Sequence, residues 1–194
     1  MKQEKLVVEV KGPGVVVGAA RALLSQCVSF VGDVPEAVYT AESQVMPGGT
    51  VGKHLRHVVD HYQAILRGRR HAATIDYDHR ERDVPMETCR DTAHRTLAGV
   101  AEELSTLTER DMHAPVRIRV MIAGDGTETE LGSTLARELA FATHHGVHHQ
   151  AMMRAIAGEF GVEASSEFGK APSTIHHEVS KAVDGGRASG LGGR

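Results

Sequence analysis

The chain of 194 residues is poor in several residue types that define whole classes of protein. It has no tryptophan, aromatic residues make up 4% of it, and its two cysteines, Cys27 and Cys89, are far apart. Two distant cysteines do not make the disulfide framework of a small secreted domain, and they suit a reducing compartment. We therefore expect a cytoplasmic protein whose fold depends on a hydrophobic core.

Strong charge asymmetry and long apolar runs are also missing. A formal net charge of -3 gives no electrostatic basis for binding nucleic acid. The N-terminus, MKQEKLVVEVKGPG, lacks the apolar centre of a signal peptide. No uninterrupted apolar run approaches the roughly 20 residues that a membrane span needs. We expect no nucleic-acid partner and no membrane partner.

The residues that are present predict an all-α fold, a four-helix bundle with a small β-hairpin insertion. Apolar residues recur at helical spacing in four stretches, at about 15–31, 51–66, 87–107 and 134–160. Thr50 is a candidate N-cap for the second stretch, which we expect to end at Gly68, and Gly161 stops the fourth. Residues 69–86 are charged and aperiodic, and we expect an ordered loop there.

The hairpin is predicted where residues 116–122 alternate apolar and polar side chains before Gly124-Asp125-Gly126. Two strands are too few to be stable alone, so we expect the hairpin to dock on the helices or to pair across a homodimer. The length allows one domain. We assign residues 1–183 to a metal-binding domain and residues 184–194 to a flexible, Gly-rich tail.

Histidine is abundant, with thirteen residues in the chain. Nine of them fall in three tight groups: 54, 57 and 61; 144, 145, 148 and 149; and 176 and 177. Grouped imidazoles are typical of a metal site.

In the predicted helix 134–160, His145 and His149 lie four residues apart at the centre of the apolar arc, whereas His144 and His148 lie round the side. Imidazoles at i and i+4 on a buried face place two nitrogens on one ion. The alternative is a pair of buried histidines that only form hydrogen bonds. We favour the metal because each buried polar ring needs partners.

The third ligand is expected from the helix 51–66, where three histidines form a stripe beside the apolar face. Helical phase slightly favours His54 or His61 over His57 and does not decide between them. The histidines of this stripe that do not bind the ion, chiefly His54 and His61, are expected to line the pocket beside it.

Two short motifs resemble those of the DinB-like superfamily of helical-bundle metalloproteins. Val51-Gly52-Lys53-His54-Leu55-Arg56-His57 is similar to the family pattern IGxxxxH, and His145-Gly146-Val147-His148-His149-Gln150 to the pattern HxxHHRGQ. The resemblance implies that His57, His145 and His149 are the metal ligands. The chain departs from the pattern after His149, where Gln150-Ala151 replaces Arg-Gly.

The resemblance implies one divalent metal ion, with zinc or nickel as the leading candidates. Three histidines leave coordination positions open for substrate. Several members of the family transfer low-molecular-weight thiols, so we expect a metal-dependent enzyme that resembles a thiol S-transferase or acts as a hydrolase on a small-molecule substrate. The alternative is a non-catalytic metal-binding or stress-response protein. Glu138 and Asp60 are candidate proton acceptors, and no catalytic residue is assigned.

Overall fold

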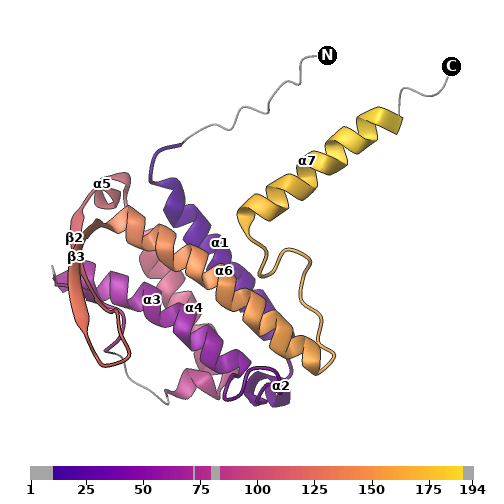
Figure 1. Ribbon diagram of the computed structural model, residues 1–194, viewed down its shortest axis with the longest axis horizontal. Coiled ribbons are helices and arrows are strands. Elements are labelled where there is room, and N and C mark those ends of the chain that lie inside the picture. The colour runs from indigo at the N-terminus through magenta and orange to yellow at the C-terminus, as the bar shows by residue number, and fades with distance from the viewer. Residues whose placement is uncertain (1–10, 72, 80–83, 190–194) are drawn as a thin grey trace.

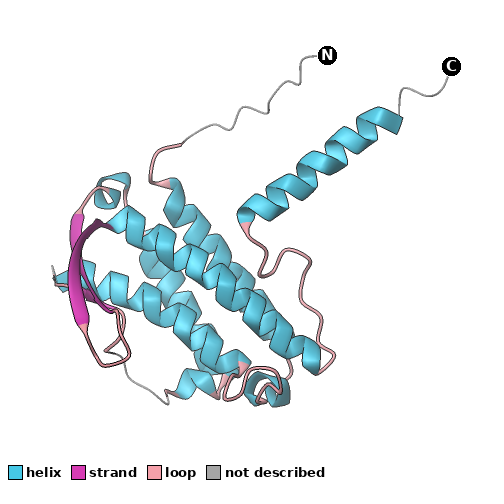
Figure 2. Ribbon diagram, in the orientation of Figure 1, coloured by secondary structure: helices cyan, strands magenta, loops and turns pink. Residues whose placement is uncertain are grey.

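The computed structural model describes residues 11–71, 73–79 and 84–189, which form a mostly helical molecule with a small three-stranded sheet (Figures 1 and 2). Its longer helices are α1 (Val15–Asp33), α3 (Val51–His71), α4 (Arg90–Ser105), α6 (Leu135–Glu159) and α7 (Pro172–Ser189). The short helical segments are α2 (Glu36–Thr40), the 3₁₀ turn η1 (Pro85–Glu87) and α5 (Glu109–Met112). The expected helical fold with a small β insertion agrees with this architecture.

Four of the long helices enclose the core. α3 packs along α6 and α4, and α1 packs along α4 and α6 (Figure 1). Each helix contributes fully buried apolar side chains to the space between them, among them Leu24, Leu55, Leu97 and Ile156. The apolar faces that the 3.6-residue periodicity predicted are thus the faces that meet.

α1 is the one helix, among the residues that the structure describes, that is long and apolar enough to cross a membrane by length and composition. The sequence of α1 has no long uninterrupted apolar run, because Arg21, Ser25 and Gln26 break it, and yet an 18-residue window reaches a mean hydropathy of 1.6. The core helix of a globular protein passes the same test. In this structure Cys27 and Val31 are fully buried against the neighbouring helices.

The start of α3 agrees with the prediction, and its end does not. The Lys53 backbone N–H donates to Thr50 Oγ1 at 3.1 Å, which makes Thr50 the N-cap. α3 continues past Gly68 to His71. Gly68 is needed for packing instead, because a Cβ there would lie 2.6 Å from Ile75 Cγ1.

The sheet contains β1 (Ile75–Asp76), β2 (Pro115–Met121) and β3 (Glu128–Thr134) in that spatial order. β2 and β3 are the predicted antiparallel hairpin, with Ile118 opposite Leu131. β1, in the segment that we expected to be a loop, pairs in parallel with β2. Ile75 and Ile118 are buried, so the hairpin docks on its own chain.

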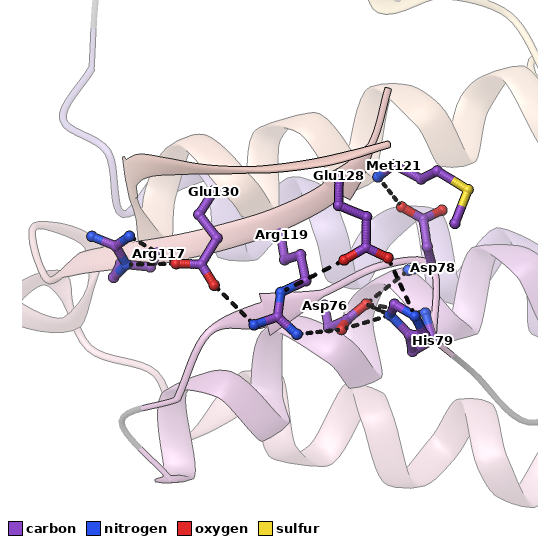
Figure 3. A network of polar contacts seen from close by, with 8 residues as sticks. All are labelled: Asp76, Asp78, His79, Arg117, Arg119, Met121, Glu128 and Glu130. Carbon is purple, nitrogen blue, oxygen red and sulfur yellow. Dashed lines mark hydrogen bonds and ion pairs between the residues drawn. The ribbon is translucent and has the colours of Figure 1, made fainter. Parts of the chain in front are cut away.

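One face of the sheet carries a ladder of ion pairs (Figure 3). Glu130 accepts hydrogen bonds from Arg117 Nη2 at 2.7 Å and from Arg119 Nη2 at 2.9 Å. Next in the ladder, His79 Nδ1 lies 3.0 Å from Asp76 Oδ2. These groups are largely exposed, so each pair adds little stability, and together they favour one register of the strands.

The segment between α6 and α7 is anchored to the core helices before α7 begins. Phe168 is buried and its ring stacks on Phe30 at 4.3 Å. Gly169 has φ +77°, and a Cβ there would lie 2.6 Å from the Ala151 backbone. α7 then extends away from the other helices (Figure 1). This helix was not predicted. It covers the first residues of the expected flexible tail 184–194, and residues 190–194 lie outside the described part of the chain.

Candidate metal centre

α3 and α6 pack against each other and bring three histidines together. His57 Nε2 lies 2.8 Å from His145 Nε2, and His149 Nε2 lies 3.2 Å from the same atom. One ring nitrogen from each of the three falls within 4.8 Å of the other two. Of the three candidates on α3, His57 is therefore the one grouped with the pair on α6.

The histidines of α6 divide between two faces, as the apolar arc predicted. His149 is buried with 8% exposure and His145 is half-buried, whereas His144 and His148 are exposed. A helix with 3.6 residues per turn places neighbours about 100° apart, so only one member of each histidine doublet faces inward.

Two glycines of the sequence motifs allow close contacts between neighbouring elements beside the cluster. A Cβ on Gly146 would lie 2.9 Å from Leu23 Cδ1, so α1 sits directly against α6 between the two histidines. A Cβ on Gly52 would lie 2.0 Å from the Glu87 carbonyl oxygen, so η1 crosses α3 at this position. Gly52 is thus required for a backbone contact, and Gly146 for a close contact with a side chain of α1.

The three nitrogens fit a divalent ion by type and by spacing. A tetrahedral ion with bonds of about 2.0–2.1 Å separates its ligand nitrogens by roughly 3.3 Å, so small ring movements from the observed separations suffice. Burial, above all, and the nearby histidines lower the pKa of His149 to about 3. His149 is therefore neutral near pH 7, with a nitrogen lone pair available to a metal.

His54 lies beside the cluster and contacts it through a single pair of nitrogens. Its Nδ1 lies 2.9 Å from His149 Nδ1. If His149 Nε2 faces a metal, its Nδ1 carries the proton and donates to His54 Nδ1, because a neutral imidazole has one donor and one acceptor. His54 thus takes the place of the carboxylate or carbonyl that commonly fixes a ligating histidine. Burial also lowers the pKa of His54.

His61 lies on the other side of the cluster. It is buried, its Nδ1 donates to the His57 carbonyl oxygen at 2.9 Å, and its ring stacks on Tyr77 at 5.1 Å. His61 therefore helps to hold the backbone and the ring of His57 in place. Its expected place in the pocket wall stays a prediction.

A cavity of about 650 Å³ opens beside the histidines. Its wall combines the loop before α3, the first turns of α3, the turn η1 and one residue of α6: Met46, Pro47, Gly48, Gly49, Lys53, His54, Arg56, His57, Glu87 and His149. Lys53 Nζ donates to the Gly48 carbonyl at 2.8 Å. Arg56 pairs with Asp60 Oδ2 at 2.8 Å and with Glu87 Oε1 at 3.3 Å. Asp60, a candidate proton acceptor, is thus held in an ion pair.

Glu138, the other candidate proton acceptor, is fully buried two turns before His145. It accepts hydrogen bonds from Tyr77 Oη at 2.6 Å, from Arg137 Nη1 at 2.9 Å and from the Ser133 hydroxyl. Burial, first, and the bond to Glu138 raise the pKa of Tyr77, so this phenol stays a donor. Glu138 therefore fixes Tyr77, on which His61 stacks.

Gln150, which replaces the arginine of the family pattern, points away from the histidines. It is buried, its Nε2 donates to the Leu23 carbonyl at 3.3 Å and to Gln26 Oε1 at 3.2 Å, and its Oε1 accepts from the Gly169 N–H at 3.4 Å. This side chain joins α6 to α1 and to the segment before α7. Its contacts are those of a packing residue.

A helical protein with three clustered histidines on two packed helices is compatible with a metal-binding class. A family model of the DinB superfamily matches residues 20–153, and the chain belongs to that superfamily. It is also similar to FK506-binding protein 5 of Rhizopus delemar, with 26% identity over 161 residues that cover 81% of this chain and 37% of the fungal protein. The chain thus spans well under half the length of that relative.

Proposed function

We propose that this protein is a divalent-metal-dependent enzyme in which His57, His145 and His149 hold one zinc or nickel ion inside a four-helix bundle. The observation that carries the proposal is the convergence of three imidazole nitrogens beside a cavity of about 650 Å³. Family membership supports it independently. A site held by three neutral histidines keeps positions open, which is typical of catalytic and not of structural zinc.

Such an ion, when bound, lowers the pKa of a thiol or water and polarises a carbonyl. The chain's own residues orient the metal ligands and attract the substrate. His54 accepts a hydrogen bond from His149 Nδ1–H and keeps that ring in one tautomer. Lys53 brings a positive charge to the cavity wall, which suits an anionic group on a substrate. We infer a small-molecule substrate, such as a low-molecular-weight thiol, in a thiol transfer or a hydrolysis.

The second candidate is a protein that stores or senses metal without turnover. In this candidate the same three histidines bind the metal, but no substrate binds in the cavity. Turnover of a thiol together with an electrophile separates the two candidates.

The test begins with metal analysis of protein purified without an affinity tag, beside a His57→Ala/His145→Ala/His149→Ala variant. The wild type should carry close to one tightly bound equivalent of zinc or nickel, and the variant should lack that equivalent. A screen of thiols with electrophiles, and of ester and amide substrates, follows on the loaded protein. A wild type that binds no more metal than the triple variant would overturn the proposal. We also propose that the protein is a homodimer. Light scattering on the same samples measures its oligomeric state.

A further inference from the structure

The outward-facing histidines of α6 have no role in the site described above. His144 and His148 are both exposed, and each immediately precedes one of the inward-facing histidines. They are four residues apart, so they form a second i, i+4 pair that runs parallel to the first and is rotated by about 100° around the same two turns. On a helix, side chains at this spacing have Cβ atoms about 5–6 Å apart, within reach of a shared ion.

The outer pair adjoins the inner cluster. The His148 ring centroid lies 5.5 Å from that of His149 and 6.4 Å from that of His145. An ion held at His148 would therefore lie close to His149, one of the proposed ligands of the inner site.

We propose that His144 and His148 form a second, exposed divalent metal site that takes ions from solution and passes them to the inner histidines. Imidazole suits nickel, copper and zinc, and two such ligands with water in the remaining positions bind an ion more weakly than three enclosed ones. A weak outer site releases its ion readily, which is what a transfer step requires. The transfer rests on the proposed function, whereas the existence of the outer site does not.

The experiment uses the metal-free full chain and nickel alone. Equilibrium dialysis with metal analysis counts the bound equivalents, and stopped-flow competition with a chromophoric chelator gives the rate of loading. His144→Ala/His148→Ala is compared with a matched control, His176→Ala/His177→Ala. The control also removes two exposed imidazoles, but adjacent residues on α7 point about 100° apart and do not share an ion.

The wild type and the control should bind one tight and one weak equivalent. The His144→Ala/His148→Ala variant should lose the weak equivalent and load the inner site several-fold more slowly, to the same final occupancy. A variant with wild-type stoichiometry and loading rate would overturn the proposal.

A further variant separates the outer site from the proposed function. His145→Ala/His149→Ala should keep the weak equivalent and lose the tight one. If the wild type bound only the weak equivalent, and His144→Ala/His148→Ala removed it, the outer site would be confirmed. The transfer step and the inner centre would then both be overturned.

Discussion

His54 and His57 stand one turn apart on α3 and have different contacts, so their replacement should have different effects. His57 Nε2 belongs to the group of three nitrogens, whereas His54 contacts that group through His149 Nδ1. His57→Ala should abolish tight nickel binding. His54→Ala should weaken it by about 10–100-fold, the usual effect of removing the partner that orients a ligand. Competition titration with a chromophoric chelator measures both affinities.

His71→Ala is the matched control, because His71 is exposed in the last turn of the same helix. Its nickel affinity should equal that of the wild type. A His61→Ala variant that abolished binding, beside a His57→Ala variant that kept it, would place the ligand one turn later on α3.

The lowered pKa of His149 predicts a loss of stability in mild acid. Its pKa is about 3 in the folded protein and about 6.5 in an unfolded chain, so the unfolded chain takes up a proton that the folded protein does not. This contribution to the free energy of unfolding is complete above about pH 6.5 and is lost progressively as the pH falls towards 3. Urea unfolding of the metal-free protein should therefore give a lower free energy at pH 5.0 than at pH 7.5.

His149→Gln removes the titrating group and should flatten this dependence between pH 7.5 and 5.0, a window that lies above the ordinary carboxylate range. His148→Gln, at the exposed neighbour, should retain most of the wild-type slope. If the His149→Gln slope equalled that of the wild type, another group would be responsible for the acid sensitivity.

At the scale of single residues, helical phase predicted the inner and outer histidines of α6, since an apolar arc defines the inner face. Phase could not choose among the histidines of α3, because they lie along the edge of its apolar arc. The choice of His57 came from the family motif, and the structure groups that residue with the α6 pair. Tyr77 was missed because it comes from an aperiodic segment. Glu87 was missed because it was assigned to the start of the helix 87–107, whereas it lies in the turn η1 and α4 begins at Arg90. Only the tertiary fold brings these two residues near α3.

At the scale of helices, Gly52 sets the distance between α3 and η1. Gly52→Ala should destabilise the protein by about 1–3 kcal/mol or more, because the new methyl group would lie 2.0 Å from a backbone carbonyl that has no rotamer to change. Gly99→Ala on α4 meets nothing within 4 Å and should stabilise by about 0.5–1 kcal/mol. Chemical denaturation of the two variants beside the wild type measures both changes.

Gly146→Ala should fall between these two variants. Its new methyl group would meet the terminal carbons of Leu23 at 2.9 and 3.0 Å, and a side chain can rotate where a backbone cannot. A Gly52→Ala variant as stable as Gly99→Ala would mean that η1 does not cross α3 as described.

The helices were predicted more completely than the sheet, for a physical reason. A long amphipathic helix repeats its pattern over several turns, so α1, α3 and α6 were located within a few residues. β1 spans two residues and carries no repeat of its own. α7 has Ile175, Val179 and Val183 at helical spacing, a pattern from which a helix could have been predicted. Gly68 was misread as a helix stop because its packing partner, Ile75, is visible only in the folded chain.

At the scale of the whole molecule, the core and the site lie within residues 15–168, and α7 stands outside them (Figure 1). The hairpin docks on its own chain, so it does not by itself require a second copy. Among the residues whose burial the structure describes, Phe168 is the last in the core. The segment after it has exposed apolar side chains, with Val179 58% and Val183 55% exposed.

This division predicts how the chain responds to truncation. A variant that ends at residue 171 should keep the melting temperature and the nickel affinity of the full chain, because it retains the stacked pair Phe30 and Phe168, and the side chains at 172–183 that it loses are mostly exposed. Phe168→Ala in the full chain should instead cost about 3–5 kcal/mol of stability, as for other buried phenylalanines. Calorimetry of the three proteins at one concentration makes the comparison. If truncation lowered the melting temperature as far as Phe168→Ala does, α7 would be packed against the core helices or against a second copy of the chain. Light scattering on the same samples would distinguish these two cases.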